Sequence, residues 1–402
     1  MTRIDLEPSA MAAGGDAIAR DRDGRVVFVE GALPGERVVA ELVEERRDYA
    51  RARTVEVVEA SPDRVAPPCR ARAEGCGGCP WQHVAPAAQP RLKAEVVADS
   101  LRRIAHVDAA TDGGRGVAVT ALRLREPALR TTARVAVRGG RAGYRRHRSH
   151  DVVPVTTCLA AHPRLEAILT AGDFGGAREA VVRVAVATGD AAAMLEPSAR
   201  GARLPAGVVV VGQRDRALAP VVEVVAGRRF RVSIRSFFQS GPVAAEALVD
   251  AVDAALAGAV GPGDRIVDAY AGVGLFGSTL AARHGARVTA IESAAAAVAD
   301  ARVNLADVDA DIVHGEVAAW RASGGSPVAV VADPARPGLG RPGVDAVASS
   351  GAPLVVLVSC DPASLGRDAA LLAGRGFTLE TVAVVDSFPH TFHVETVARF
   401  AR

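Results

Sequence analysis

The segment "IVDAYAGVGLFGSTLA", residues 266–281, runs from an apolar strand through a glycine-rich turn into a helix. Gly272, Gly274 and Gly277 have G-x-G-x-x-G spacing, which lets the backbone approach a ligand at a helix N-terminus. The next apolar strand ends at Glu292, where a carboxylate can accept both hydroxyls of a ribose. The segment therefore predicts a nucleotide-type cofactor site in an α/β domain.

Strands and helices alternate on both sides of this turn. We expect helices at 242–260, 274–285, 295–308 and 363–376, and strands at 265–270, 287–293, 328–334 and 353–362. The strands are continuously apolar, which is typical of a doubly wound, mostly parallel sheet buried on both faces.

The glycine turn alone fits NAD and S-adenosylmethionine equally, and a purely structural turn is a third reading. Asp268 closes the first strand, where its carboxylate can meet the cationic amino-acid end of the methyl donor. Tyr270 offers a ring beside it, and the sheet is followed by a cysteine loop without an obvious hydride acceptor. These details favour S-adenosylmethionine.

The stretch "VVLVSCDPASLGRD" places Cys360 just beyond an apolar strand, at the edge where such sheets bind ligands. A parallel strand delivers Asp333 and Arg336 to the same edge. A thiolate that adds to carbon 6 of a pyrimidine turns the ring into an enolate, so that carbon 5 can accept a methyl group. Arg336 and Arg367 are candidates to help ionise the thiol, and a small buried core residue is the alternative.

After methyl transfer, the proton on carbon 5 must be removed before the cysteine can leave, and a carboxylate suits that step. Glu395, in "FPHTFHVETVARF", lies in an apolar segment and is flanked by His390 and His393. A glutamate inside an apolar strand is costly unless it has a task. We expect Glu395 to be the base, with a structural ion pair as the alternative.

Three of the five cysteines, Cys69, Cys76 and Cys79, lie within eleven positions. No apolar run approaches the roughly 18 to 20 residues that cross a bilayer, and the start lacks a secretory pattern, so we expect a cytoplasmic protein. Thiols stay reduced there, and the grouping indicates metal ligands or catalytic groups rather than disulfides.

The remaining segments are rich in short strands. Residues 1–60 alternate between apolar and polar positions and are broken by Gly and Pro, which predicts a small antiparallel barrel; 89–105 has helical spacing; and 130–233 predicts an antiparallel sheet. The net charge is only +2, and Lys93 is the sole lysine. Nine arginines against the single acid Glu126 in 123–150 predict a surface that contacts phosphate.

With these residues together, the chain resembles the iron-sulfur-containing RNA uridine-C5 methyltransferases over nearly all of its 402 residues. The resemblance implies three domains. They are an N-terminal OB-like RNA-binding TRAM barrel (1–60), a central β-rich domain with an iron-sulfur cluster (61–233), and a Rossmann-like class I S-adenosylmethionine-dependent methyltransferase domain (234–402).

The resemblance also implies residue roles. Cys158 would be the distant fourth ligand, so that the four cysteines hold a 4Fe-4S cluster, although their spacing alone fits zinc equally. Cys360 would be the nucleophile and Glu395 the base. The implied S-adenosylmethionine contacts are Gln239, Tyr270, Leu275, Glu292, Glu316 and Asp333. Two positions depart from the family pattern, Gly241 in place of an asparagine and Ala335 in place of a proline.

The expected partner is RNA, with ribosomal RNA favoured over transfer RNA, and we expect no DNA or membrane partner and a monomeric enzyme. The target uridine must leave its stack to meet the thiol, which favours single-stranded or looped RNA. Two rival functions stay open at this point. One is an NAD-linked iron-sulfur oxidoreductase, and the other is a non-catalytic RNA-binding protein.

Overall fold

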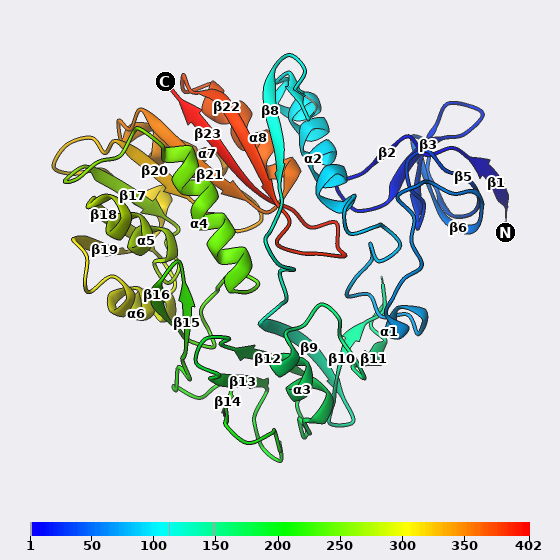
Figure 1. Cartoon of the computed structure of the whole chain (residues 1–402), viewed down its shortest axis with the longest axis horizontal. Helices are drawn as coiled ribbons and strands as arrows, with labels where there is room; N and C mark the ends of the chain where they lie inside the picture. Colours follow the sequence, from blue (N-terminus) through cyan, green and yellow to red (C-terminus); the bar gives the residue numbers. More distant parts are fainter. Residues whose placement is uncertain (1, 112, 148) are drawn as a thin grey trace.

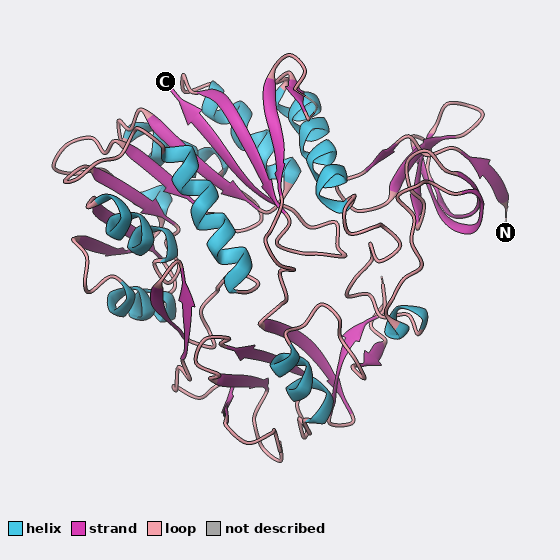
Figure 2. Cartoon of the chain, in the orientation of Figure 1, coloured by secondary structure: helices cyan, strands magenta, loops and turns pink. Residues whose placement is uncertain are grey.

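A computed structural model of the chain describes residues 2–111, 113–147 and 149–402. Figure 1 shows a small N-terminal β-unit, a central β-rich unit and a large helix-covered sheet that contains the C-terminus. Figure 2 shows that most of the helices surround the large sheet. Within the described ranges, no helix is long and apolar enough to span a membrane.

The N-terminal unit is a six-stranded sheet in the order β1-β5-β6-β4-β3-β2. Its strands are β1 (Arg3–Leu6), β2 (Ala10–Met11), β3 (Ala17–Arg20), β4 (Val26–Glu30), β5 (Arg37–Glu45) and β6 (Tyr49–Glu59). The pairing of β5 with β6 shifts register three times, and such bulges bend strands. Val27 and Val29 face a core that Trp81 and Leu92, from the following segment, help to fill.

The large sheet has nine strands in the order β19-β18-β17-β20-β21-β23-β22-β8-β7. They are β7 (Ala109–Ala110), β8 (Val117–Leu122), β17 (Arg265–Ala269), β18 (Arg287–Glu292), β19 (Ala310–His314), β20 (Ala329–Ala332), β21 (Leu354–Ser359), β22 (Thr378–Val385) and β23 (Glu395–Ala401). The run from β19 to β21 is parallel. The last strand of the chain, β23, inserts antiparallel between β21 and β22.

Helices cover both faces of this sheet. They are α2 (Gln89–Ser100), α4 (Pro242–Leu256), α5 (Leu275–His284), α6 (Ala295–Asn304), α7 (Gly340–Ser349) and α8 (Pro362–Ala373). Alternate residues of β21 separate the two cores: Val356 packs with residues of α4 and α5, whereas Val355 packs with residues of α2, α7 and α8. The predicted doubly wound sheet, buried on both faces, is confirmed.

The central unit is a second six-stranded sheet, in the order β11-β10-β9-β12-β13-β14. Its elements are β9 (Thr132–Arg138), β10 (Arg141–Arg145), β11 (Val152–Pro154), α3 (Pro163–Ala171), β12 (Glu179–Val184), β13 (Ala191–Glu196) and β14 (Val208–Gly212). As predicted, β9 and β10 form a hairpin, in which Gly139 and Gly140 supply the positive φ angles of the turn. A short helix, α1 (Arg70–Ala73), lies in the cysteine segment.

Three stretches predicted to belong to the central domain pack with the large sheet or its covering helices instead, and the first is α2, which covers β8. The strands β7 and β8 extend that sheet, because β8 pairs with β22. The hairpin of β15 (Val221–Val225) and β16 (Arg228–Val232) packs on α4 and α6. Alternating apolar residues predict a strand but not the strand with which it pairs. The partner of β8 is β22, which lies more than 250 residues away along the chain.

Candidate active site and cysteine pocket

The glycine turn joins β17 to α5 and is held by two carboxylates. Gly272 and Gly274 have φ angles of 56° and 85°, which favour glycine. The Gly272 N–H donates to Glu292 Oε2 at 2.9 Å, and the Gly277 N–H donates to Asp268 Oδ2 at 2.7 Å. The backbone therefore passes close to both strand ends, as the sequence pattern predicts.

Asp268 is a buried carboxylate with one unused acceptor. Its Oδ1 has no hydrogen-bond partner among the described residues, and burial raises the pKa of its carboxyl to about 7. An unpaired buried acceptor costs free energy that a ligand's donor would recover. Asp268 is therefore suited to receive a cationic or N–H group of a bound cofactor.

Glu292 and Tyr270 lie on either side of the glycine turn. Both Glu292 oxygens already accept backbone N–H groups, one of them from Ala294 at 2.6 Å, so the carboxylate is held in a fixed orientation. Tyr270 is half-buried in the left-handed region, with a φ of 62°. Burial raises the pKa of Tyr270, and Asp368 and Glu316 raise it further, which places Glu316 within electrostatic reach of the phenol.

Gln239 and Asp333 connect the segment before α4 to the end of β20. Gln239 Nε2 donates to Asp333 Oδ2 at 3.2 Å. Burial raises the pKa of Asp333 to about 7, against the lowering effect of this bond. Leu275, the first residue of α5, is buried behind the turn. A side chain at Gly241 would place its Cβ 2.5 Å from the Leu129 carbonyl oxygen, so the family's asparagine has no room there.

Cys360 and Glu395 come from strands that pair side by side. Ser359 of β21 is opposite Thr396 of β23, and the Thr396 hydroxyl donates to the Ser359 carbonyl at 2.9 Å. Cys360 therefore follows β21 at the edge where Glu395 begins β23. Glu395 also pairs with Val385 at the end of β22 and is 5% exposed.

The charges around Cys360 keep its thiol protonated. Burial raises its pKa to about 11, with Glu395 and Asp333 adding to the rise and Arg336 opposing it. Arg336 is 64% exposed and lies 3.6 Å from Asp361. The other candidate, Arg367, donates instead to the Ser364 hydroxyl at 2.8 Å.

We expect alkylation of Cys360 by iodoacetamide to be slow at neutral pH and to rise about tenfold per pH unit between pH 7 and 9, because only the thiolate reacts and its pKa lies above that range. The measurement is the pH dependence of modification of the Cys360 peptide by mass spectrometry. Added S-adenosylmethionine brings a positive charge that should accelerate the reaction. A rate that levels off below pH 8 without cofactor would contradict the raised pKa.

The two histidines near Glu395 have packing roles. Burial lowers the pKa of His393 to about 4, with Arg336 and Arg130 lowering it further, so its ring is neutral. That ring lies against Phe392, with centroids 4.6 Å apart. His390 takes a φ of 63°, and its N–H donates to Gln89 Oε1 at 2.6 Å.

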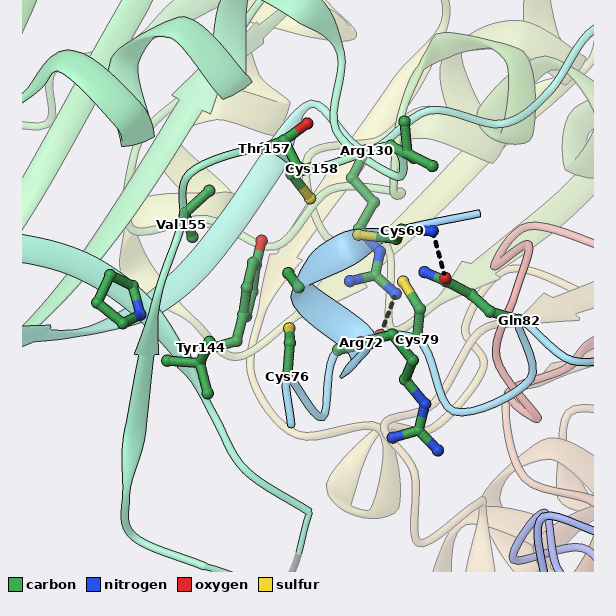
Figure 3. A pocket seen from close by; sticks show the side chains of 15 residues that line it. Cys69, Arg72, Cys76, Cys79, Gln82, Arg130, Tyr144, Val155, Thr157 and Cys158 are labelled. Carbon is green, nitrogen blue, oxygen red and sulfur yellow. Dashed lines mark hydrogen bonds between the residues drawn. The ribbon is translucent and has the colours of Figure 1, made fainter. Parts of the chain in front are cut away.

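The four remaining cysteines line one pocket between the cysteine segment, residues 69–82, and the central unit (Figure 3). They are Cys69, Cys76, Cys79 and Cys158, all free thiols of intermediate burial. Burial raises the pKa values of Cys76 and Cys79. In the described part of the chain, no three His, Cys, Asp or Glu side chains are grouped closely enough to hold a metal ion.

Arg130 and Tyr144 also line this pocket, and sequence reasoning missed both. The Arg130 guanidinium donates to the Gly78 carbonyl at 3.4 Å. Its charge opposes the rise in the pKa of Cys79 that burial causes. Arg130 counts among the predicted phosphate-binding arginines, but it reaches the thiols instead. Arg130 and Gly78 are 52 residues apart, and no sequence pattern predicts their contact.

Four of the other arginines of 123–150 fall into two pairs with different surroundings. Arg134 and Arg145 both pair with Glu179, at 3.4 and 2.7 Å. Arg123 and Arg125 instead line two surface grooves beyond the end of β8. Arg148, also part of the predicted surface, lies outside the described residues.

Comparison with known proteins agrees with this arrangement. Residues 3–55 match the TRAM domain family. The chain is 40% identical to an uncharacterized RNA methyltransferase of Streptomyces avermitilis, over 98% of this chain and 97% of that protein. It is 35% identical to the 23S rRNA (uracil(1939)-C(5))-methyltransferase RlmD of Methylococcus capsulatus, over 94% and 93%. The chain belongs to the RNA uracil-C5 methyltransferases.

A solved structure extends the likeness of this RNA uracil-C5 methyltransferase to the whole fold. The tRNA (uracil-54, C5)-methyltransferase of Pyrococcus abyssi, in complex with S-adenosyl-L-homocysteine, superposes with a TM-score of 0.72, covering 98% of this chain and 99% of that one. The two sequences are 22% identical. The predicted TRAM domain, the methyltransferase fold and the enzyme class, a S-adenosylmethionine-dependent RNA uracil-C5 methyltransferase, are confirmed.

Proposed function

We propose that this enzyme methylates carbon 5 of a uridine in RNA through a covalent bond between Cys360 and the uracil ring, with Glu395 as the base. The observation that carries the proposal is the strand pairing that brings Cys360 and Glu395 to one sheet edge. Asp333 lies at the same edge and contributes to the pKa values of both groups. A thiol, a buried base and a cofactor turn thus occupy one site.

The proposed reaction has three steps. The Cys360 thiolate forms a bond to carbon 6, and the displaced electron pair makes carbon 5 nucleophilic. Carbon 5 attacks the sulfonium methyl, and the methyl–sulfur bond breaks to release S-adenosylhomocysteine. Glu395 then takes the proton from carbon 5, the ring double bond re-forms, and the bond between carbon 6 and sulfur breaks to return the thiolate.

The electrostatics support this division of roles. Burial raises the pKa of Glu395 well above its usual value, with Asp333 adding to the rise. The carboxyl must therefore lose its proton before it acts, and the carboxylate is then a stronger base than an ordinary glutamate. Since the resting thiol is protonated, it must release its proton to solvent before it attacks carbon 6, and nearby positive charge favours that release. The exposed Arg336 and the sulfonium of the bound cofactor would supply this charge.

We propose that the methyl donor binds along the glycine turn. The buried, unpaired oxygen of Asp268 and the open space beside Gly272 fit a cationic ligand at this turn. Glu292 would orient the ribose, and Tyr270 would pack against the donor. The proposed contacts are Gln239, Tyr270, Leu275, Glu292, Glu316 and Asp333.

We propose that the four-cysteine pocket holds a 4Fe-4S cluster. Four thiols that face a common space suit a cluster whose irons each take one thiolate. A single zinc ion would need all four sulfurs to converge on one point. The cluster would join the segment of Cys69, Cys76 and Cys79 to the central unit through Cys158, a structural role.

Protein purified without oxygen should contain about four iron and four sulfide per chain and absorb broadly near ~400 nm. Cys79→Ser should lose most of this iron and lower the unfolding temperature, because the cluster would tie two units together. Cys360→Ser is the matched control and should keep its iron. A colourless protein with stoichiometric zinc would overturn the cluster assignment.

We propose that the substrate is ribosomal RNA, in preference to transfer RNA. Two relatives above 30% identity, from Methylococcus capsulatus and Halomonas elongata, are named 23S rRNA methyltransferases. The N-terminal TRAM unit and the grooves lined by Arg123 and Arg125 would contact the RNA outside the catalytic edge. The uridine would be flipped or presented by a loop, because Cys360 must reach carbon 6.

The test is incubation of the enzyme with methyl-labelled donor and total RNA from cells that lack the gene. Digestion to nucleosides should place the label on carbon 5 of uridine, in the large ribosomal RNA fraction. Label on ribose oxygens or exocyclic nitrogens would overturn the reaction. Label in transfer RNA alone would overturn the substrate assignment and leave the chemistry intact.

A further inference from the structure

Residues 386–394 form a strap, here called the β22–β23 strap, that links the last two strands of the sheet. Val385, the residue before the strap, pairs directly with Glu395, the residue after it. Both ends of the strap therefore lie at the edge that carries Cys360. Figure 1 shows this loop beside the end of α2. Any change in its path would move Glu395.

Lys93 of α2 holds the first part of the strap. Its ammonium lies 2.6 Å from Asp386 Oδ1 and donates to the Phe388 carbonyl at 2.9 Å. Lys93 is 0% exposed, and the Asp386 side chain is 12% exposed. This ion pair is thus taken almost completely out of water, one residue beyond the partner of Glu395.

Gln89, one turn earlier on α2, holds the middle of the strap. Its Oε1 accepts the His390 N–H at 2.6 Å, and its Nε2 donates to the Val84 carbonyl at 2.9 Å. The His390 carbonyl in turn accepts the N–H of Trp81 at 2.8 Å. The strap is therefore fastened to one face of α2 and to the segment that follows the cysteines.

A buried ion pair adds little net stability compared with a well-packed apolar pair, because both charges must be desolvated. The effect of this ion pair is on position rather than on stability, since the ammonium holds its two acceptors at fixed places. Lys93 is also the only lysine of the chain. Its compact ammonium is bonded to two acceptors, whereas a guanidinium would bring five donors in a planar fork to the same enclosed space.

We propose that Lys93 is a positioning residue of the methyl-transfer reaction: by holding Asp386 and Phe388, it sets the β22–β23 strap so that Glu395 faces the proton on carbon 5. This inference rests on the proposed function, because it assumes a covalent adduct that Glu395 resolves. It predicts a specific defect. Without Lys93 the adduct should form but be released slowly.

The test compares Lys93→Met with the wild type and with Arg375→Met, which removes an exposed ion pair with Asp345 of α7. Lys93→Met should bind S-adenosylmethionine as the wild type does. Its turnover should fall by up to about 100-fold, because a small displacement of a reacting group is costly. On a denaturing gel it should accumulate protein covalently linked to RNA, whereas Arg375→Met should match the wild type.

A double variant separates positioning from stability. Lys93→Met/Asp386→Leu replaces the ion pair by an apolar pair and should recover the unfolding temperature. It should still accumulate the adduct, because the bond to the Phe388 carbonyl is also missing. Recovery of full turnover in the double variant would overturn the inference, since a merely structural residue would be rescued.

Glu395→Gln and Cys360→Ala on the same gel distinguish the two levels of the proposal. If Glu395→Gln accumulates the adduct and Lys93→Met does not, the positioning role is overturned and the reaction stands. If Cys360→Ala keeps its activity, the covalent mechanism itself is overturned. Wild-type turnover in Lys93→Met would likewise overturn the role of Lys93.

Discussion

Replacement of Cys360 by alanine should abolish methyl transfer, with a loss of at least about 1,000- to 10,000-fold in single-turnover rate. Carbon 5 of uracil is too weak a nucleophile to displace a sulfonium methyl unless the ring first receives electrons. No other cysteine is placed to substitute, because the remaining four line the cysteine pocket and not the sheet edge that carries Cys360. The measurement is transfer of labelled methyl from S-adenosylmethionine to RNA, with the enzyme in excess.

Cofactor affinity should be nearly unchanged in this variant. The proposed contacts come from the segment before α4, the turn after β17, the ends of β18 and β20 and the loop after β19, and none of them depends on the thiol. Unfolding temperature and iron content are the controls for folding, because Cys360 is half-buried and its removal leaves only a small space. Activity within about tenfold of the wild type would show that the methyl group reaches carbon 5 without a covalent adduct.

The methyltransferase domain could be predicted from the sequence because the patterns that specify it are short and contiguous along the chain. Apolar strands, a glycine turn and helices in alternation leave few other architectures. The positions of β7 and β8 could not be predicted in this way. Their alternation is compatible with any sheet, and only pairing with β22, far along the chain, decides which one they join.

Part of the site was predictable for the same reason. Asp268 and Glu292 end successive strands, and ends of parallel strands meet at one edge. The approach of Glu395 to Cys360 depends on the antiparallel insertion of β23, which its apolar sequence does not specify. The roles of Cys360 and Glu395 were predicted from their residue types and from the family resemblance. Their proximity is visible only in the fold.

The residues that support the site were the least predictable. Lys93 lies in an ordinary helical pattern, and its burial against Asp386 depends on a contact 293 residues away. The lone lysine among 48 basic residues was the one available signal. Composition can single out such a residue, but only tertiary packing assigns it a partner.

Glu395→Gln should convert the enzyme into one that captures its substrate. Glutamine keeps the shape of the side chain but cannot accept the proton from carbon 5, so the methylated ring cannot eliminate the Cys360 thiolate. Turnover should fall by about 100- to 10,000-fold, while the protein linked to RNA accumulates. The measurement is a slow-migrating band on a denaturing gel with end-labelled RNA.

The double variant Cys360→Ala/Glu395→Gln is the control for this band. Without the Cys360 thiol, no covalent bond between the protein and the uracil ring can form. The band should disappear in the double variant and should require S-adenosylmethionine if it contains the methylated ring. A glutamate that only stabilises the strand would give a different result. In that case Glu395→Gln would lower the unfolding temperature and the turnover together, with no band. Asp333 would then be the next carboxylate to test as the base, since it lies close enough to raise the pKa of Cys360.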